Sequence, residues 1–115
     1  MSKSLCYEYT GTKGHIADVA GTLPQNPQDL IDAGWKDVSD PRQAQHGYHL
    51  YEEPGTGLRV RFDPKQEGQP GFRGKDHYHI LNPVATGNDD LYLDSSGNPG
   101  RKNSRKSHIL PNGGN

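Results

Sequence analysis

Three short runs of this chain alternate between apolar and polar side chains, and this period of two restricts the fold more than any other feature. The runs are HGYHLYEE, LRVRFD and DHYHIL. Successive side chains of a β-strand point to opposite faces, so each run predicts a strand with one apolar and one polar face. The segment EPGTG, between the first two runs, has the proline and glycines of a turn and predicts a hairpin.

Two more strands are predicted downstream of these runs. The stretch DLYLDSSGNPG predicts a short fourth strand that a turn ends. The stretch from Ser107 to Leu110, which follows a run of basic residues, predicts a last strand at the edge of the sheet.

A short helix is predicted upstream of the strands, in the stretch TLPQNPQDLIDAGW. Asn26 suits the N-cap, Pro27 suits the first helical position, and Gly34 is typical of a helix end. Trp35, directly after the helix, is expected to anchor the core. A second short helix is expected around residues 15–19.

These elements predict an α+β fold, in which a short N-terminal helix or helices pack on one face of a four- to five-stranded antiparallel sheet. The other face of the sheet is expected to stay open. We divide the chain into a lead-in segment (1–21), one folded domain (22–112) and a frayed tail (113–115). The 115 residues suit one small domain, and the 15 glycines, 9 prolines and only 29% hydrophobic residues indicate a thin core and many loops.

Charge and cysteine content exclude several classes of function. The formal net charge of −1 gives no long-range attraction to nucleic acid, so phosphate binding has to be local. The single cysteine, Cys6, excludes an internal disulfide and a cysteine-based zinc cluster. No stretch has the features of a membrane span or a signal peptide. Basic residues without a neighbouring acid gather near the C-terminus, at Arg101, Lys102, Arg105 and Lys106.

The polar faces of the alternating runs carry the main candidate residues. If the apolar residues turn toward the helix, the open face gathers imidazoles, guanidiniums and a tyrosine: His49, Tyr51, Arg59, Arg61, His77 and His79. Imidazoles exchange protons near neutral pH, and guanidiniums bind phosphate and stabilise negative charge. These groups suit RNA cleavage without a metal. A base takes the 2′-hydroxyl proton, an acid protonates the leaving 5′-oxygen, and cations stabilise the phosphorane between them.

Other residues are expected to flank this face. His108 would bring a further imidazole to its edge, with Ser107 beside it, and Tyr51 would stack on a base. Asp76 either caps a turn or orients His77, and both interpretations stay open. Basic residues in the loop before the histidine strand and near the C-terminus are expected to guide the RNA backbone: Arg73, Lys75 and Lys106.

The same residues allow other interpretations. Polar positions of an exposed strand, such as Arg59 and Arg61, are often only solvated, and a lone histidine is more often structural. An H-x-H pair is also a common arrangement of metal ligands, with His49, His108 or an acid as a third ligand. The arginines beside the pair would repel a cation, and no second ligand motif is present. We therefore expect no metal and no cofactor.

Several stretches resemble a known group of proteins. GKDHYHILNP, GNDDLYLDSSGNP and KSHILPNG look like C-terminal nuclease domains of bacterial polymorphic toxins, and NPQDLIDAGWKDV is similar to the helix-then-Gly-Trp entry of barnase-like ribonucleases. The resemblance covers residues 22–112. It implies a barnase, EndoU, colicin and RelE-like fold, with N-terminal helices on a four-stranded antiparallel sheet and a metal-independent RNase site on the exposed face. The positions that match its motifs are His77, His79, Ser107 and His108.

The resemblance also implies a biological setting. The chain would be an RNase toxin of a bacterial competition system, with tRNA as a candidate target. It would be secreted or delivered at the cell surface as the tail of a larger toxin, and it would act in the cytoplasm of the target cell. Its partners would be RNA and a cognate immunity protein, with no membrane in the final state, and we expect a monomer. Two alternatives stay open: a metal-dependent DNase toxin that uses the histidine pair as ligands, and a non-enzymatic binding module.

Overall fold

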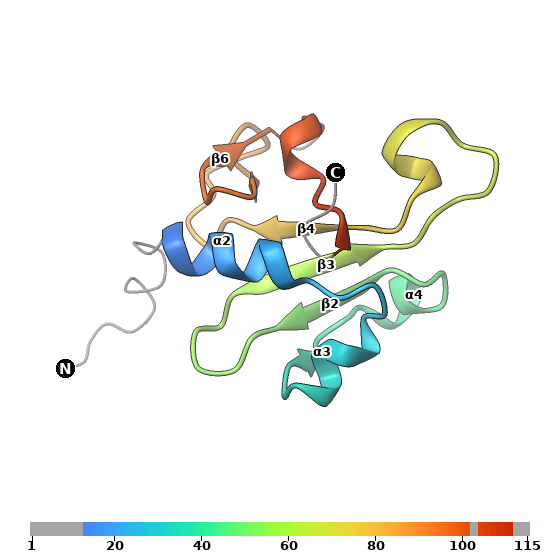
Figure 1. The fold of residues 1–115 in the computed structure, drawn as a ribbon, viewed down its shortest axis with the longest axis horizontal. Helices are drawn as coiled ribbons and strands as arrows, with labels where there is room; N and C mark the ends of the chain where they lie inside the picture. Colours follow the sequence, from blue (N-terminus) through green and yellow to red (C-terminus); the bar gives the residue numbers. More distant parts are fainter. Residues whose placement is uncertain (1–12, 102–103, 112–115) are drawn as a thin grey trace.

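The computed structural model describes residues 13–101 and 104–111, and these form helices packed on a six-stranded antiparallel sheet (Figure 1). Every strand pairs with its neighbour in the sequence, in the order β1-β2-β3-β4-β5-β6. The predicted α+β class is confirmed, with a slightly higher strand count than expected. The strands are β1 Lys36–Asp37, β2 His49–Glu52, β3 Arg59–Asp63, β4 His77–Leu81, β5 Tyr92–Leu93 and β6 Pro99–Gly100.

The predicted hairpin joins β2 to β3, and the segment between them turns as its glycines suggested. Gly55 and Gly57 have φ angles of 86° and 77°, in the left-handed region that glycine adopts without strain. The backbone N–H of Glu53 donates to the carbonyl of Leu58 at 2.8 Å and closes the turn. Because this hairpin fixes the register of β2 against β3, it also decides which side chains share a face.

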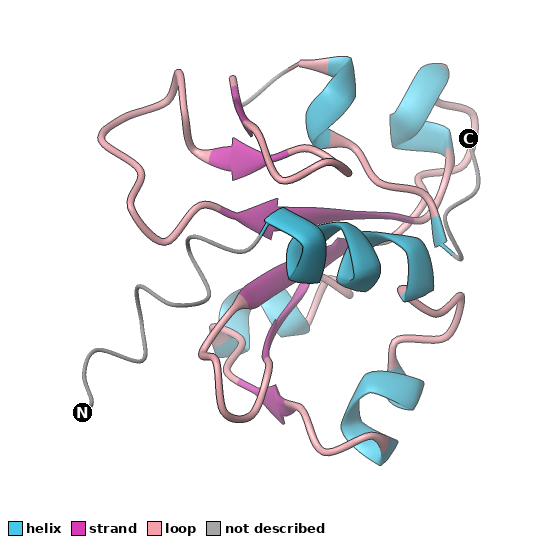
Figure 2. Ribbon diagram, turned by 60° about the vertical axis from the view of Figure 1, so that its left-hand side comes forward, coloured by secondary structure: helices cyan, strands magenta, loops and turns pink. Residues whose placement is uncertain are grey.

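The helix α2, Lys13–Thr22, crosses the sheet and packs on one of its faces (Figure 2). Its buried residues Ile16, Val19 and Ala20 recur at helical spacing and join the hydrophobic core. The short helix expected around residues 15–19 is therefore formed, and it packs on the sheet although residues 1–21 were predicted as a lead-in segment. Residues 1–12, with Cys6, and residues 112–115, with the predicted frayed tail, lie outside the described residues.

The predicted helix near Asn26 is α3, Gln28–Asp32. Pro27, and not the predicted Asn26, is at the N-cap. The side-chain oxygen of Asn26 still accepts a hydrogen bond from the backbone N–H of Gln28 at 3.0 Å, and Gly34 follows the helix with a φ angle of 102°. Trp35 is partly buried and packs against the core, as expected. A third helix, α4, Pro41–Ala44, precedes β2 and begins at Asp40, whose carboxylate accepts from the backbone N–H of Arg42 at 2.9 Å.

The predicted edge strand from Ser107 to Leu110 is not formed. Residues Arg105–Ser107 form the 3-10 helix η2, and only Ile109 pairs with the sheet, through two backbone hydrogen bonds of 2.8 and 2.9 Å to Tyr78. The reason is the space available along β4. Its second half pairs with β5, and only the edge beside Tyr78 is left for the C-terminal segment.

The core lies between α2, α3 and one face of the sheet, and Tyr78 is at its centre. The ring of Tyr78 is 0% exposed and meets Phe62 edge-on, with the ring centroids 5.2 Å apart. Its hydroxyl donates to the carbonyl of Pro24 at 2.6 Å, in the segment that joins α2 to α3. Tyr78 therefore ties the helical layer to the central strand. None of the helices in the described ranges is long and apolar enough to cross a membrane.

We expect Tyr78→Phe to lower the free energy of unfolding by about 1 kcal/mol, because it leaves the Pro24 carbonyl without its donor and keeps the packed ring. Chemical denaturation measures the change. Tyr51→Phe is the matched control: its ring is also buried, but within the described part of the chain its hydroxyl has no hydrogen-bond partner. Equal losses in the two variants would contradict the role assigned to the Tyr78 hydroxyl.

Candidate active site

The polar faces of β3 and β4 coincide, as the alternation predicted. Arg61 lies opposite His79 and Asp63 lies opposite His77, and residues directly opposite in an antiparallel pair share a face. The alternate residues of both strands belong to the hydrophobic core under α2. The sheet thus separates an apolar face from a face that carries imidazole, guanidinium and carboxylate groups.

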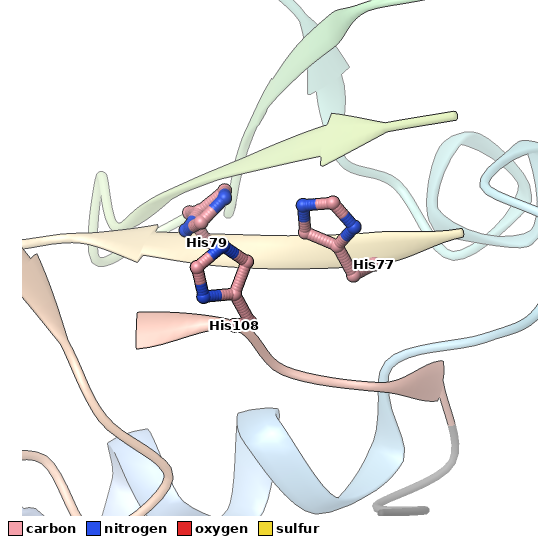
Figure 3. Close-up of side chains that lie close together, drawn as sticks. All are labelled: His77, His79 and His108. Carbon is pink, nitrogen blue, oxygen red and sulfur yellow. The ribbon is translucent and has the colours of Figure 1, made fainter. Parts of the chain in front are cut away.

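His108 joins this face from the C-terminal segment (Figure 3). The bridge between Tyr78 and Ile109 directs the residue before Ile109 toward His79. The ring centroids of His77, His79 and His108 lie 4.7 to 5.0 Å from one another. The three imidazoles line a cavity of about 180 Å³, and its further lining includes Tyr48, Arg61, Asp63, Gln66, Arg73 and Tyr92.

A single carboxylate, that of Asp63, organises the cluster. It accepts two hydrogen bonds from Arg61, from Nε at 2.8 Å and from Nη2 at 2.9 Å. The Nε2 atoms of His77 and His79 each lie 3.4 Å from its Oδ2. Burial raises the pKa of Asp63, but the hydrogen bonds from the two imidazoles and the arginine outweigh it and hold the pKa far below its usual value. Asp63 was not among the predicted site residues, although it is the next alternate position after Arg61 in the same run.

His77 is arranged to keep its proton. Its Nδ1 donates to the carbonyl of Lys75 at 2.9 Å, and its Nε2 faces Asp63, so both ring nitrogens meet acceptors. Burial lowers the pKa of His77, but the interactions with Asp63 and the Lys75 carbonyl more than offset this, and the net shift is upward from 6.5. His77 is therefore a candidate proton donor near neutral pH.

His79 and His108 are arranged to stay neutral. His79 is 3% exposed, and its Nδ1 is buried without a hydrogen-bond partner, so a second proton there would be unsatisfied. Burial lowers its pKa more than Asp63 raises it. His108 donates from Nδ1 to the carbonyl of Ser104 at 2.8 Å, which leaves the lone pair on Nε2. Burial also lowers the pKa of His108, and the Ser104 carbonyl offsets this only in part.

Aromatic rings cover the cluster, and the expectation of an open face is wrong. Phe72, from the 3-10 helix η1 (Gly71–Gly74), stacks on His108 with the ring centroids 4.6 Å apart. Tyr92 of β5 stacks on His79 at 4.4 Å. Phe72 also meets His77 edge-on at 6.2 Å, and His77 and His79 are only 5% and 3% exposed. Short alternating runs reveal which residues share a face, but they carry no information on the distant segments that fold over it.

The loop between β3 and β4 is tied down close to the cluster. The carboxylate of Asp76 accepts from the backbone N–H of Lys65 at 2.7 Å and closes the base of the loop. Asp76 thus caps the loop, and His77 is oriented by the Lys75 carbonyl and by Asp63 instead. Arg73, carried by the same loop, lines the cavity as a phosphate-binding residue would.

The expected position of Tyr51 is wrong, and His49 does not join the three imidazoles. Their partners across the hairpin are Val60 and Phe62, which belong to the core. Tyr51 is part of that core, whereas His49 is only partly buried and lines a neighbouring cavity. Tyr51 is 4% exposed within the core, and the Nδ1 of His49 lies 3.3 Å from a carboxylate oxygen of Asp37. The sequence could not decide which face of HGYHLYEE turns to the core, because Leu50 lies on one face and Tyr51 on the other.

The remaining predicted residues are more peripheral. Arg59 forms an ion pair with Glu52 at 3.0 Å, and the buried Ser107 donates from Oγ to the carbonyl of Ser104 at 2.8 Å. Their contacts with RNA stay predictions, as do those of the exposed lysines. Besides His49 and Tyr51, four predicted residues do not line the cavity of the three imidazoles: Arg59, Lys75, Lys106 and Ser107.

The three histidines also have the geometry of a metal centre. Each offers one nitrogen, and these atoms lie within 4.8 Å of one another. Donation from Nδ1 to a backbone carbonyl, as in His77 and His108, often orients metal-binding histidines. A metal would need all three rings neutral, next to the charged Arg61, whereas the surroundings of His77 favour its protonated form.

Comparisons of the chain with protein-family models, with curated proteins and with solved structures found no match. What the site can do is therefore argued from its own geometry.

We expect His77 to have a different pKa from His79 and His108. NMR titration of the ring signals should give His77 a pKa above 6.5, and His79 and His108 pKa values below it. Asp63→Asn should lower the pKa of His77, because it removes the charge that stabilises the imidazolium. A common pKa for the three rings, or a His77 pKa unchanged in this variant, would contradict the role of Asp63.

Proposed function

We propose that this domain is a metal-independent endoribonuclease in which His108 is the general base and His77 the general acid. The observation that carries the proposal is the divergence of protonation within one cluster. Two imidazoles with ring centroids 5.0 Å apart have pKa values shifted in opposite directions, beside a guanidinium. Pairs of titratable groups whose environments separate their pKa values are typical of acid–base sites.

The reaction begins with the neutral His108. Its Nε2 removes the proton of a ribose 2′-hydroxyl, and the oxygen attacks the adjacent phosphorus. Negative charge grows on the phosphorane oxygens, and the Arg61 guanidinium at the cavity wall stabilises it. His77 then gives its Nε2 proton to the departing 5′-oxygen. This nitrogen lies 3.4 Å from Asp63, a long and therefore weak hydrogen bond, so the proton is available for transfer. The products carry a 2′,3′-cyclic phosphate and a 5′-hydroxyl.

Asp63 and His79 act as positioning residues. Asp63 keeps His77 protonated and holds the guanidinium of Arg61 in one orientation through two hydrogen bonds. His79 fills the space between Asp63 and Tyr92 as a neutral ring, so it adds no positive charge that would lower the pKa of His77.

We also propose the toxin setting. The support is that GKDHYHILNP and KSHILPNG, two stretches that carry the resemblance to polymorphic toxin nucleases, meet in the cavity through His77, His79 and His108. In this setting the domain is delivered by a larger secreted protein, cleaves RNA in the target cell and is held inactive by an immunity protein in the producer.

The metal-dependent nuclease is the second candidate, and the close approach of three imidazole nitrogens favours it. The two candidates differ in their response to a chelator and to the nucleic acid offered. A metal site loses its activity in chelator, whereas acid–base cleavage of RNA continues.

The first test is incubation of the purified protein with total cellular RNA, with and without chelator. We expect cleavage in both, with 2′,3′-cyclic phosphate ends. His77→Ala and His108→Ala should each lower kcat by about 10²- to 10⁴-fold, the usual contribution of a general acid or base. His46→Ala is the matched control, because His46 is exposed and does not line the cavity. Activity that chelator abolishes, or that survives both substitutions, would overturn the proposal.

The pH profile of kcat/KM tests the assignment of acid and base. The base has to be neutral, and the lowered pKa of His108 places the acidic limb below pH 6.5. The acid has to be protonated, and the raised pKa of His77 places the alkaline limb above pH 6.5. The profile should therefore be a bell with one limb on each side of pH 6.5, and Asp63→Asn should move its alkaline limb to lower pH. A profile with one limb only would show that the two roles are misassigned.

A further inference from the structure

A second, larger cavity of about 500 Å³ adjoins the catalytic one. Tyr48, Arg61 and Tyr92 line both cavities, so these three residues form a wall that the two cavities share. The guanidinium carbon of Arg61 lies 5.4 Å from the centre of the Tyr92 ring and fixes this wall. None of the three candidate catalytic histidines lines the second cavity, so its role is a different one.

The lining of this cavity follows from strand register. Leu50 lies opposite Arg61, and Leu81 lies opposite Tyr92, so these leucines are on the face of the catalytic cluster and not in the core. Leu91, just before β5, adds a third aliphatic side chain. All three leucines are only partly buried. Aliphatic side chains between two tyrosines form an apolar hollow that suits a flat aromatic group.

The rim of the cavity is polar and comes from α4. The carboxylate of Asp40 already accepts the hydrogen bond that starts the helix. Gln43, one turn later, is exposed and lines the cavity, and a carboxamide both donates and accepts hydrogen bonds. Gln43 therefore has the chemistry to read the edge of a base.

We propose that this cavity binds the nucleobase of one of the two nucleotides that flank the scissile phosphate. The inference rests on the proposed RNase function and adds a subsite to it. With the phosphate held beside Arg61 and the histidines, the attached ribose directs a base across the Arg61–Tyr92 wall. Proteins bind unpaired RNA bases by stacking them on aromatic rings and by hydrogen-bonding their edges. Tyr48, which is only partly buried, and Gln43 supply these two kinds of contact.

The occupant we favour is a base and not an apolar side chain of a protein. The reason is the shared wall: the guanidinium of Arg61 lines both the hollow and the cavity of the three imidazoles, so a ligand whose base fills the hollow can present its phosphate to Arg61. A protein that filled the hollow would block the catalytic cavity without supplying a substrate to it.

The test uses the full chain and the sixteen dinucleotide steps of RNA, each cleaved separately. The unmodified protein should prefer one base at one of the two positions by on the order of tenfold in kcat/KM. Gln43→Ala should reduce this preference to about twofold or less. Leu91→Trp, which fills the hollow, should lower kcat/KM for the preferred step by on the order of tenfold. Gln45→Ala is the matched control, because Gln45 is exposed near the same helix but does not line the cavity.

A binding measurement separates this inference from the proposed catalysis. The probes are the four nucleoside 3′-monophosphates, and the readout is the NMR shift of the leucine methyl groups of the cavity. Shifts at Leu50, Leu81 and Leu91 that Gln43→Ala weakens support the subsite, even if no RNA is cleaved, in which case only the catalytic proposal fails. Cleavage of RNA with no methyl shift, and with a base preference unchanged in Gln43→Ala, overturns the subsite and leaves the catalysis standing. If the protein shows no cleavage of RNA and no binding of nucleotides, both proposals are overturned. Gln43 is exposed, so its variant stays interpretable if Leu91→Trp fails to fold.

Discussion

The candidate site depends on the buried carboxylate of Asp63. A charge removed from water has to be compensated, and here Arg61 does so with two hydrogen bonds while two imidazoles face the same carboxylate. The two imidazoles differ in their other hydrogen-bond partners. His77 has a second acceptor in the Lys75 carbonyl and keeps its proton, whereas the Nδ1 of His79 has no partner. One carboxylate thus produces two chemically different imidazoles on the same strand.

This concentration of polar groups is possible because the sheet places the core residues on one face and the polar cluster on the other. The apolar residues of β3 and β4 lie under α2, and Tyr78 ties that layer to the strand through the Pro24 carbonyl. In a chain with 29% hydrophobic residues, one face has to supply nearly all of the apolar burial. The other face is covered by rings that also serve the site, since Phe72 stacks on His108 and Tyr92 on His79.

The sequence was informative where local pattern decides the structure. The α+β class, the hairpin, the helix after Asn26 and the shared face of Arg61, His77 and His79 all follow from periodicity and turn residues. The local pattern does not predict which distant segments pair with each other. The face of Tyr51 depends on register against Val60, and the coverage of the imidazoles depends on loops that bring Phe72 and Tyr92 to them. The importance of Asp63 was missed because a carboxylate at a strand end usually meets solvent.

Arg61 connects the two parts of the proposed substrate site. One edge of its guanidinium is held by Asp63, and its carbon lies over the ring of Tyr92, so the group is fixed from two directions. A guanidinium that is already oriented loses little freedom when charge develops on a phosphate, and this is the condition under which electrostatic stabilisation is most effective. The same residue lines both the cavity of the three imidazoles and the adjoining hollow. Under the proposed function, a base that enters the hollow would press against the wall that holds this cation, and this contact would couple recognition of the nucleotide to cleavage of its phosphodiester.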